Sequence, residues 1–129
     1  MLDAGYDFSF AGLKTAIVYF LKKHKGAKRE DVAASFQRAV VDVLVRKTLK
    51  AAKELKVERI AVVGGVAANS ELRERFQEEA EPRGLEVYFP SLRLCTDNAA
   101  MIAAAAQFRY QELGEKHPLS LAPEPSLRI

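Results

Sequence analysis

Two short loops carry the residues whose types and spacing indicate chemistry, and the first is Gly64-Gly65-Val66-Ala67-Ala68-Asn69. It directly follows the apolar run Arg59 to Val63 and precedes a helical pattern. Glycine has no Cβ, so a ligand can approach its backbone closely, and a helix start offers free N–H groups to an anion. The loop therefore predicts an anion-binding turn. The alternative is a tight strand-to-helix turn in which Asn69 is only the helix N-cap.

The second loop is Cys95-Thr96-Asp97-Asn98, which also follows an apolar run and also opens a helix. The carboxylate of Asp97 could bind a metal ion that holds phosphates. The alternative again is structural, with Asp97 or Thr96 as the N-cap of the following alanine-rich helix.

Two further segments have weaker signals. Asp7 to Thr15 (DFSFAGLKT) predicts a helix start capped by Ser9, and Gly12 in its first turn predicts close approach by a neighbour. Lys14 could meet an anion, or it could simply be solvated. The basic run from Lys22 to Arg29 could contact a nucleic-acid backbone, although such runs are more often solvated loops.

Composition excludes several classes of protein. The 129 residues carry a formal charge of +3, far from that of an arginine-rich nucleic-acid binder. A single cysteine, Cys95, excludes an internal disulfide and fits the reducing cytoplasm. The sequence has no HExxH pattern, no GxSxG elbow, and no apolar stretch long enough to span a membrane.

The elements that must position these loops follow from hydrophobic periodicity and from the glycines and prolines. We expect one α/β domain over residues 1–129, helix-rich, with a small and mostly parallel sheet. Helices are expected at 10–24, 31–56, 69–79 and 98–113, strands at 59–63 and 85–89, and an irregular tail around Pro118, Pro123 and Pro125.

Two of these elements have specific packing expectations. The long helix has the apolar stripe Val32, Phe36, Ala39, Val40, Val43, Leu44, Ala51 and Leu55, and its middle is apolar nearly all round, which predicts a central position. The run Arg59 to Val63 is expected to be a buried strand.

Taken together and in this order, four segments resemble the carboxyl-terminal half of the TsaD/Gcp (YgjD) family. They are DFSFAGLKT, VAASFQRAVVDVL, RIAVVGGVAANSELRERF and CTDNAAMIAAAA. The family comprises the tRNA N6-adenosine threonylcarbamoyltransferases, formerly called O-sialoglycoprotein endopeptidases. The resemblance implies one lobe of an actin-like ATPase fold, which is related to ribonuclease H.

The resemblance also implies roles for particular residues. Gly64, Gly65 and Asn69 match the loop that contacts the nucleotide, either ATP or the threonylcarbamoyl-adenylate. Asp97 matches the aspartate that binds one divalent metal, iron or zinc, together with two histidines of an HxxxH motif. The implied reaction transfers the threonylcarbamoyl group to the N6 amine of the adenosine next to the tRNA anticodon.

The HxxxH motif is not in this sequence, so we expect a fragment that lacks the amino-terminal lobe and is inactive alone. The implied partners are tRNA, a TsaB-like paralogue, a TsaE-like small ATPase and the missing lobe. Self-association through the exposed lobe surface is also expected. The alternative functions are a metal-dependent glycoprotease-type peptidase, an actin-like ATPase and a non-catalytic interaction module.

Overall fold

The computed structural model describes residues 5–8, 10–114, 120 and 122. The chain divides into two compact units, Met1–Cys95 and Thr96–Ile129, and each is described by itself. The single domain over residues 1–129 stays a prediction. The predicted tail around Pro118, Pro123 and Pro125 lies outside the described residues, as does His117.

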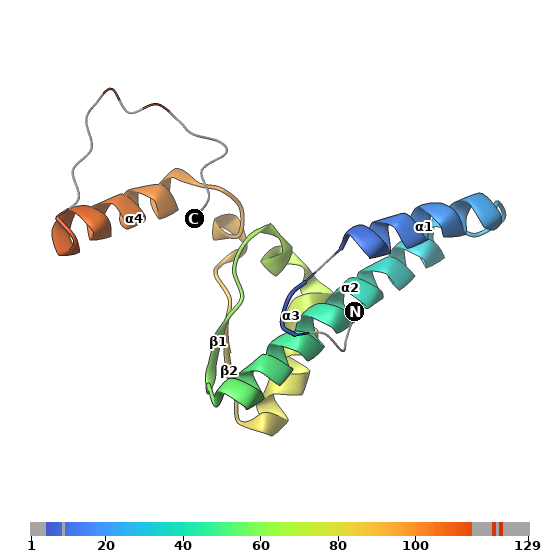
Figure 1. Cartoon of the computed structure of the whole chain (residues 1–129), viewed down its shortest axis with the longest axis horizontal. Helices are drawn as coiled ribbons and strands as arrows, with labels where there is room; N and C mark the ends of the chain where they lie inside the picture. The colour runs from blue at the N-terminus through green and yellow to red at the C-terminus, as the bar shows by residue number, and fades with distance from the viewer. Residues whose placement is uncertain (1–4, 9, 115–119, 121, 123–129) are drawn as a thin grey trace. The chain divides into compact units, whose positions relative to one another are not determined.

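The first unit contains two long helices, a shorter helix and a pair of strands (Figure 1). Its elements are α1 (Ala11–Lys23), α2 (Arg29–Leu55), β1 (Arg59–Ala61), η1 (Gly65–Ala68), α3 (Ser70–Ala80), η2 (Glu81–Arg83), β2 (Glu86–Tyr88) and η3 (Leu92–Leu94). Strand β1 pairs with β2 in parallel, with Ile60 opposite Val87. The predicted order of elements, the parallel pairing and the helix-rich α/β class are confirmed.

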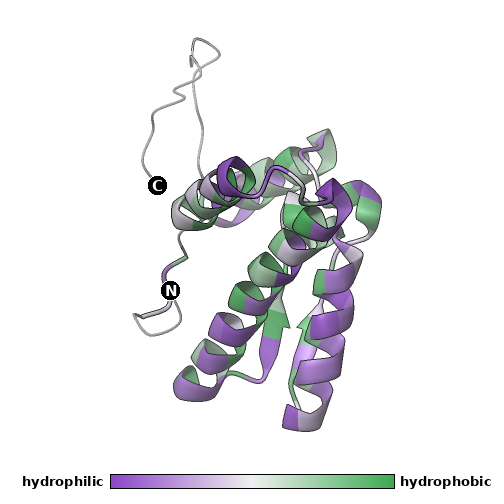
Figure 2. Cartoon of the chain, turned by 90° about the vertical axis from the view of Figure 1, so that its right-hand side faces the viewer, coloured by the Kyte–Doolittle hydropathy of each residue, from purple (hydrophilic) through white to green (hydrophobic). Residues whose placement is uncertain are grey.

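The hydrophobic core lies where α2 and α3 pack against one face of the sheet (Figures 1 and 2). Its buried members are Val41, Val45, Leu49, Ala52, Ile60, Leu72, Phe76 and Ala80. The ring of Phe76 meets that of Phe89 edge-on, with centroids 6.1 Å apart. The predicted central position of the middle of α2 is confirmed, since residues 39–45 are all buried or half-buried.

The apolar stripe predicted for α2 is only partly right. The residues that reach the core are Val41, Val45, Leu49 and Ala52, whereas Leu55 of the predicted stripe is 64% exposed. The helix is apolar on several sides, so its periodicity could not select the face that α3 and the sheet cover.

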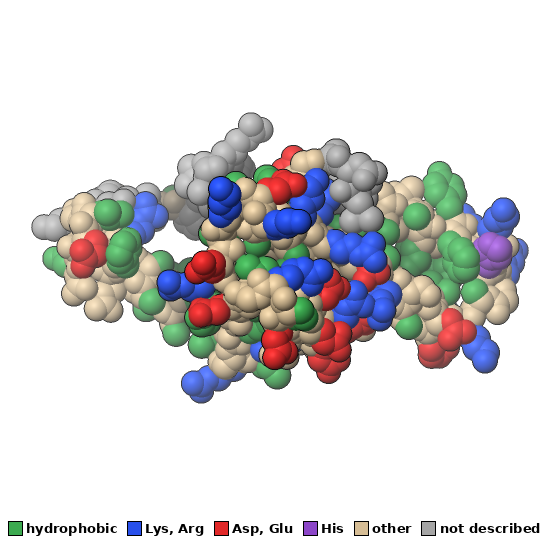
Figure 3. All heavy atoms as spheres, turned by 90° about the horizontal axis from the view of Figure 1, so that it is seen from below, with side chains coloured by type: hydrophobic (Ala, Val, Ile, Leu, Met, Phe, Trp, Pro, Cys, Tyr) green, Lys and Arg blue, Asp and Glu red, His purple; other side chains and the backbone are tan. Residues whose placement is uncertain are grey.

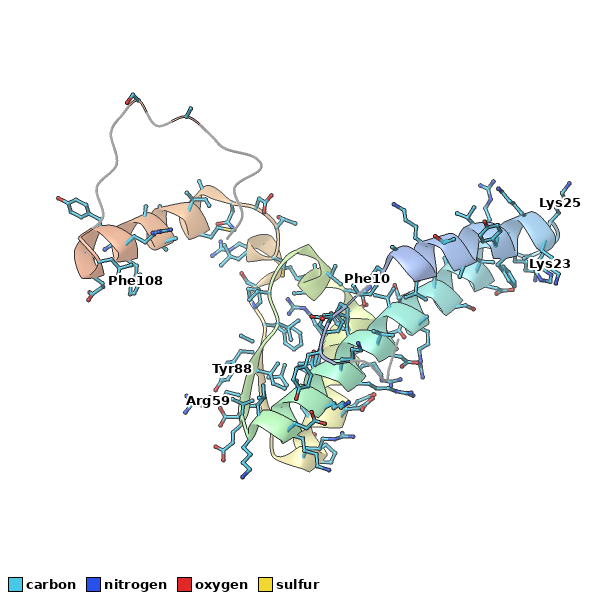
Figure 4. The ribbon with its side chains drawn as sticks, in the orientation of Figure 1. Phe10, Lys23, Lys25, Arg59, Tyr88 and Phe108 are labelled. Atoms are coloured by element: carbon cyan, nitrogen blue, oxygen red, sulfur yellow. The ribbon has the colours of Figure 1, made fainter. Side chains whose placement is uncertain are left out.

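The expectation that the run Arg59 to Val63 forms a buried strand is only partly right. Ile60 faces the core, but Arg59 and Ala61 on the opposite face are exposed. Figure 4 shows Arg59 and Tyr88 pointing away from α2 and α3. Within the first unit, the helices cover only one face of the two-stranded sheet, so alternate residues remain open to solvent.

Helices α1 and α2 form a hairpin that extends beyond the core (Figure 1). No described residue of α1 is buried. The N-cap position is Phe10, which makes no capping side-chain hydrogen bond, while the predicted cap Ser9 lies outside the described residues. The close approach predicted at Gly12 is wrong, because a Cβ there would meet no atom of another element within 4 Å in the described part of the chain.

The second unit contains α4 (Ala99–Glu112). The helix ends as predicted, with Gly114 at φ 66° just beyond Leu113. No residue of α4 is buried. Among the described residues of the whole chain, no helix has the length and apolar character needed to cross a bilayer.

Candidate functional site

The loop from Gly64 to Asn69 lies at the carboxyl end of β1, where ligands of parallel α/β sheets bind. Gly64 has φ 89° and ψ 176°, a backbone conformation open essentially only to glycine. Gly65 has no positive φ, and a Cβ built on it would meet nothing within 4 Å. No contact within the described chain therefore explains why residue 65 lacks a side chain.

Asn69 fulfils the structural alternative, since it is the N-cap of α3. Its Oδ1 accepts a hydrogen bond of 2.9 Å from the backbone N–H of Leu72. Its Nδ2 donates to Oε1 of Gln37 on α2 over 3.1 Å. Both ends of the amide are therefore engaged, although the Nδ2 group has a second N–H that could donate to a ligand.

A network of polar contacts continues from Gln37 and joins α2 to α3. Gln37 donates to the carboxylate of Glu71, and Arg38 lies 3.6 Å from the other oxygen of Glu71. This network fixes the first turn of α3, and with it Asn69, relative to α2.

Arg73, which the sequence analysis did not single out, contacts the loops that follow both strands. Its Nε donates to the carbonyl of Ala67 in the first loop over 2.6 Å. Its Nη2 donates to the carbonyl of Pro90, after β2, over 2.7 Å. The signal that could have found Arg73 is its place four residues after the N-cap, because helical side chains lean toward the helix N-terminus.

The loop after β2 ends at Cys95, whose side chain is buried at 3% exposure. Its Sγ accepts from Nη2 of Arg73 over 3.3 Å and donates to the carbonyl of Ser91 over 3.5 Å. Cys95 is therefore part of the packing of the first unit.

Asp97 lies in the second unit, two residues along the chain, and its side chain is exposed. The structural alternative predicted for it is wrong, because the N-cap of α4 is Asn98. Oδ1 of Asn98 accepts from the N–H of Met101 over 3.0 Å, and Nδ2 donates to the carbonyl of Thr96. No hydrogen bond or ion pair engages the Asp97 carboxylate in the described part of the chain, so it is open to a ligand.

The donor groups near Asp97 do not make a metal site by themselves. Over residues 5–8, 10–114, 120 and 122, no three His, Cys, Asp or Glu side chains gather closely enough to hold an ion. A single carboxylate binds a metal weakly, so Asp97 fits only as one ligand of a site completed by other donors.

Comparisons with known proteins agree on one family. The family model of TsaD, described as tRNA N6-adenosine threonylcarbamoyltransferase, matches residues 1–104. A protein with that name from Thermotoga neapolitana is 54% identical over all of this chain, which covers 39% of the relative. Others from Carboxydothermus hydrogenoformans and Thermosipho africanus are 52% and 48% identical, with 38% and 40% of their lengths covered. The chain thus spans about two fifths of the length of these relatives.

Proposed function

Because the chain belongs to the TsaD family of tRNA N6-adenosine threonylcarbamoyltransferases, we propose that it forms the nucleotide-binding part of such an enzyme. In the proposed reaction the N6 amine of the adenosine next to the tRNA anticodon attacks the carbamoyl carbon of threonylcarbamoyl-adenylate. The amine loses a proton, the new C–N bond forms, and the adenylate leaves. The helix-rich α/β lobe with its small parallel sheet agrees with the actin-like ATPase fold of the family.

The observation that carries the proposal is the open glycine turn at the carboxyl end of β1. Gly64 turns the chain through a conformation reserved for glycine, and Gly65 leaves a space that nothing in the described structure fills. An adenine nucleotide, either ATP or the threonylcarbamoyl-adenylate, would pass along this backbone beside Asn69.

We propose Asp97 as one ligand of a divalent metal, iron or zinc. Its carboxylate is exposed and does not serve as the helix cap, which supports this role. The remaining ligands would come from other parts of a whole enzyme, so we propose that this chain alone is inactive. A bound metal would supply charge stabilisation during acyl transfer.

The proposed partners follow from the family. They are tRNA in the cytoplasm, a TsaB-like paralogue, a TsaE-like small ATPase, and the amino-terminal lobe of a longer enzyme. The exposed apolar side chains of α1, including Val18 and Leu21, support a surface that such a partner or lobe would cover.

A substitution series at Asn69 tests the nucleotide proposal. Asn69→Ser keeps an oxygen that can cap α3 but removes the amide donor, whereas Asn69→Ala removes both. We expect Asn69→Ser to weaken binding of ATP to the chain by about tenfold, measured by calorimetric titration, with little change in thermal stability. Asn69→Ala should also lower the free energy of unfolding, by about 1 kcal/mol.

The outcome separates the two roles of Asn69. If Asn69→Ser binds ATP as tightly as the unaltered chain, Asn69 is only a cap. If the unaltered chain binds neither ATP nor a stable analogue of the threonylcarbamoyl-adenylate, the nucleotide proposal fails for this chain.

A non-catalytic interaction module is the second candidate, favoured by the exposed apolar residues of the α1–α2 hairpin, such as Tyr19 at 67% exposure. Activity assays on a full-length protein that contains this segment discriminate the catalytic functions, and the absence of all three activities would favour the interaction module. Modification of tRNA by that protein supports the transferase, metal-dependent cleavage of a sialoglycoprotein supports the peptidase, and steady ATP turnover without tRNA supports the ATPase.

A further inference from the structure

The two loops that follow β1 and β2 are joined through one side chain, Arg73. Its Nε and Nη2 belong to one planar guanidinium group, and each donates to a different loop: Nε to the carbonyl of Ala67 and Nη2 to the carbonyl of Pro90. The same Nη2 reaches Sγ of Cys95. A single planar group therefore connects segments far apart in the sequence.

The identity of the residue suits this task. Arginine presents several N–H donors in a rigid planar fork, whereas lysine has a compact ammonium on a flexible stem. The Cζ atom of Arg73 also lies 4.9 Å from the centroid of the Phe89 ring. The guanidinium group therefore contacts an aromatic ring while its N–H groups donate hydrogen bonds to the loops. The ring of Phe89 is held in turn by Phe76 of the core.

Several backbone hydrogen bonds of each loop stay within that loop, while Asn69 at the end of the first loop is held by Leu72 and Gln37. In the first, the N–H of Ala67 bonds to the carbonyl of Gly64, and that of Asn69 bonds to Val66, so these bonds stay within the loop. In the second, the N–H of Leu94 bonds to Ser91 and that of Cys95 to Leu92, again within the loop. Among the described residues, the side chain of Arg73 therefore links the first loop to the second and connects the second loop to α3.

We propose that Arg73 is a positioning residue that holds the Gly64–Asn69 loop and the Pro90–Cys95 loop in one fixed arrangement. The inference rests on the proposed function only in taking the first loop as the nucleotide loop. Arg73 acts through the backbone carbonyl of Ala67, two residues before Asn69, and does not itself touch a ligand in this proposal.

Arg75 provides a matched control on the same helix. Among the described residues, its hydrogen bonds and ion pairs go to Asp42 and Glu79, at 3.2 and 2.8 Å, and to neither loop. The hydrogen bond to Glu79 also raises the pKa of Arg75 above its ordinary value. Arg73→Met and Arg75→Met remove the same charge and keep a similar aliphatic stem.

The experiment measures amide hydrogen exchange across the whole 129-residue chain, by mass spectrometry, at temperatures that give the variants equal global stability. We expect the amides of Ala67, Asn69, Leu94 and Cys95 to exchange about tenfold faster in Arg73→Met than in Arg75→Met. Amides in the middle of α2 should exchange equally in both. Arg73→Lys should not restore slow exchange in both loops, because lysine lacks the fork.

Several outcomes would overturn the inference. They are equal exchange of the loops in the two methionine variants, faster exchange in only one loop, or full protection of both loops in Arg73→Lys. Each would show that the guanidinium does not join the loops.

ATP titration of the same variants keeps the two proposals apart. If the unaltered chain binds ATP, Arg73→Met should weaken binding by about tenfold and Arg75→Met should not. If the unaltered chain does not bind ATP, the nucleotide proposal fails, while hydrogen exchange still decides the role of Arg73.

Discussion

At the scale of single residues, Gly64 and Gly65 are neighbours that lack a side chain for different physical reasons. Gly64 has a positive φ of 89°, so any Cβ there strains the backbone. Gly65 has no positive φ, and a Cβ on it would lie in open space among the described residues, so only a ligand or another chain segment would meet it.

We expect Gly64→Ala to lower the free energy of unfolding by about 1–3 kcal/mol, measured in urea. Gly65→Ala should change it by less than about 0.5 kcal/mol yet weaken ATP binding, because the methyl group would enter the nucleotide path. ATP binding by Gly65→Ala at the unaltered affinity would count against a nucleotide on this backbone.

Asp97 and Asn98 form a second pair with separate roles. Asn98 caps α4, so Asn98→Ala should destabilise this helix by about 1 kcal/mol, seen as a loss of helical circular dichroism on heating. Asp97→Ala should leave the helix unchanged. In a full-length enzyme that contains this segment, Asp97→Ala should abolish tRNA modification, and unaltered activity would exclude Asp97 as a metal ligand.

At the scale of elements, the end of the α1–α2 hairpin combines positive charge with exposed aromatic side chains. Lysine and arginine side chains gather there beside apolar ones (Figure 3), and Figure 4 shows Lys23 and Lys25 at the tip. Nζ of Lys22 lies 5.9 Å from the ring centroid of the exposed Tyr19. Cations bind the phosphate backbone of RNA and an exposed aromatic ring can stack on a base, although Glu30 and Asp31 at the start of α2 reduce the local charge.

If this tip contacts tRNA, replacing Lys22, Lys23 and Lys25 by glutamine should weaken tRNA binding. The slope of log affinity against log salt should also fall by about 2 to 3, because each phosphate contact contributes just under one unit. Fluorescence anisotropy with labelled tRNA over a salt series measures both quantities.

The control replaces Lys50, Lys53 and Lys56, at the other end of α2, by glutamine, which removes the same charge. An equal loss of tRNA binding in both triple variants would show a general charge effect instead of a contact at the hairpin tip.

At the scale of the whole molecule, large apolar side chains stay exposed on both units. Residues of α1 and α4 contribute, including Val18 at 47% and Ile102 at 64% exposure, and Figure 4 labels Phe108 on α4. Exposed apolar surface of this kind favours association with another chain or another part of a longer one.

We therefore expect the chain to self-associate at high concentration, measured by light scattering. Phe108→Glu should reduce association, because it places a charge on the apolar surface of α4, whereas Gln107→Glu adds the same charge at a polar position and serves as its control. A chain that remains monomeric at high concentration, or equal association of the two variants, would contradict a role for this surface.

The sequence by itself determined the order of elements and the parallel pair of strands, and it offered Asn69 as one candidate for the helix cap that the structure shows. Hydrophobic periodicity, glycine turns and capping residues are local, so a few neighbouring residues carry each of these signals. The resemblance to the TsaD family also rested on short local motifs, and the comparisons confirmed it.

Only the tertiary structure decided which face of α2 is buried, that one face of the sheet stays exposed, and that Arg73 joins the two loops. These facts depend on contacts between residues far apart in the sequence, such as Arg73 with Pro90 and Ile60 with Val87. Helix α2 is apolar on several sides, so its sequence does not mark the buried face. In a sequence, an arginine that bridges two loops looks the same as an arginine exposed to solvent. The burial of a residue and the groups that its side chain can contact depend on the elements that pack against it, and local spacing in the sequence does not contain that information.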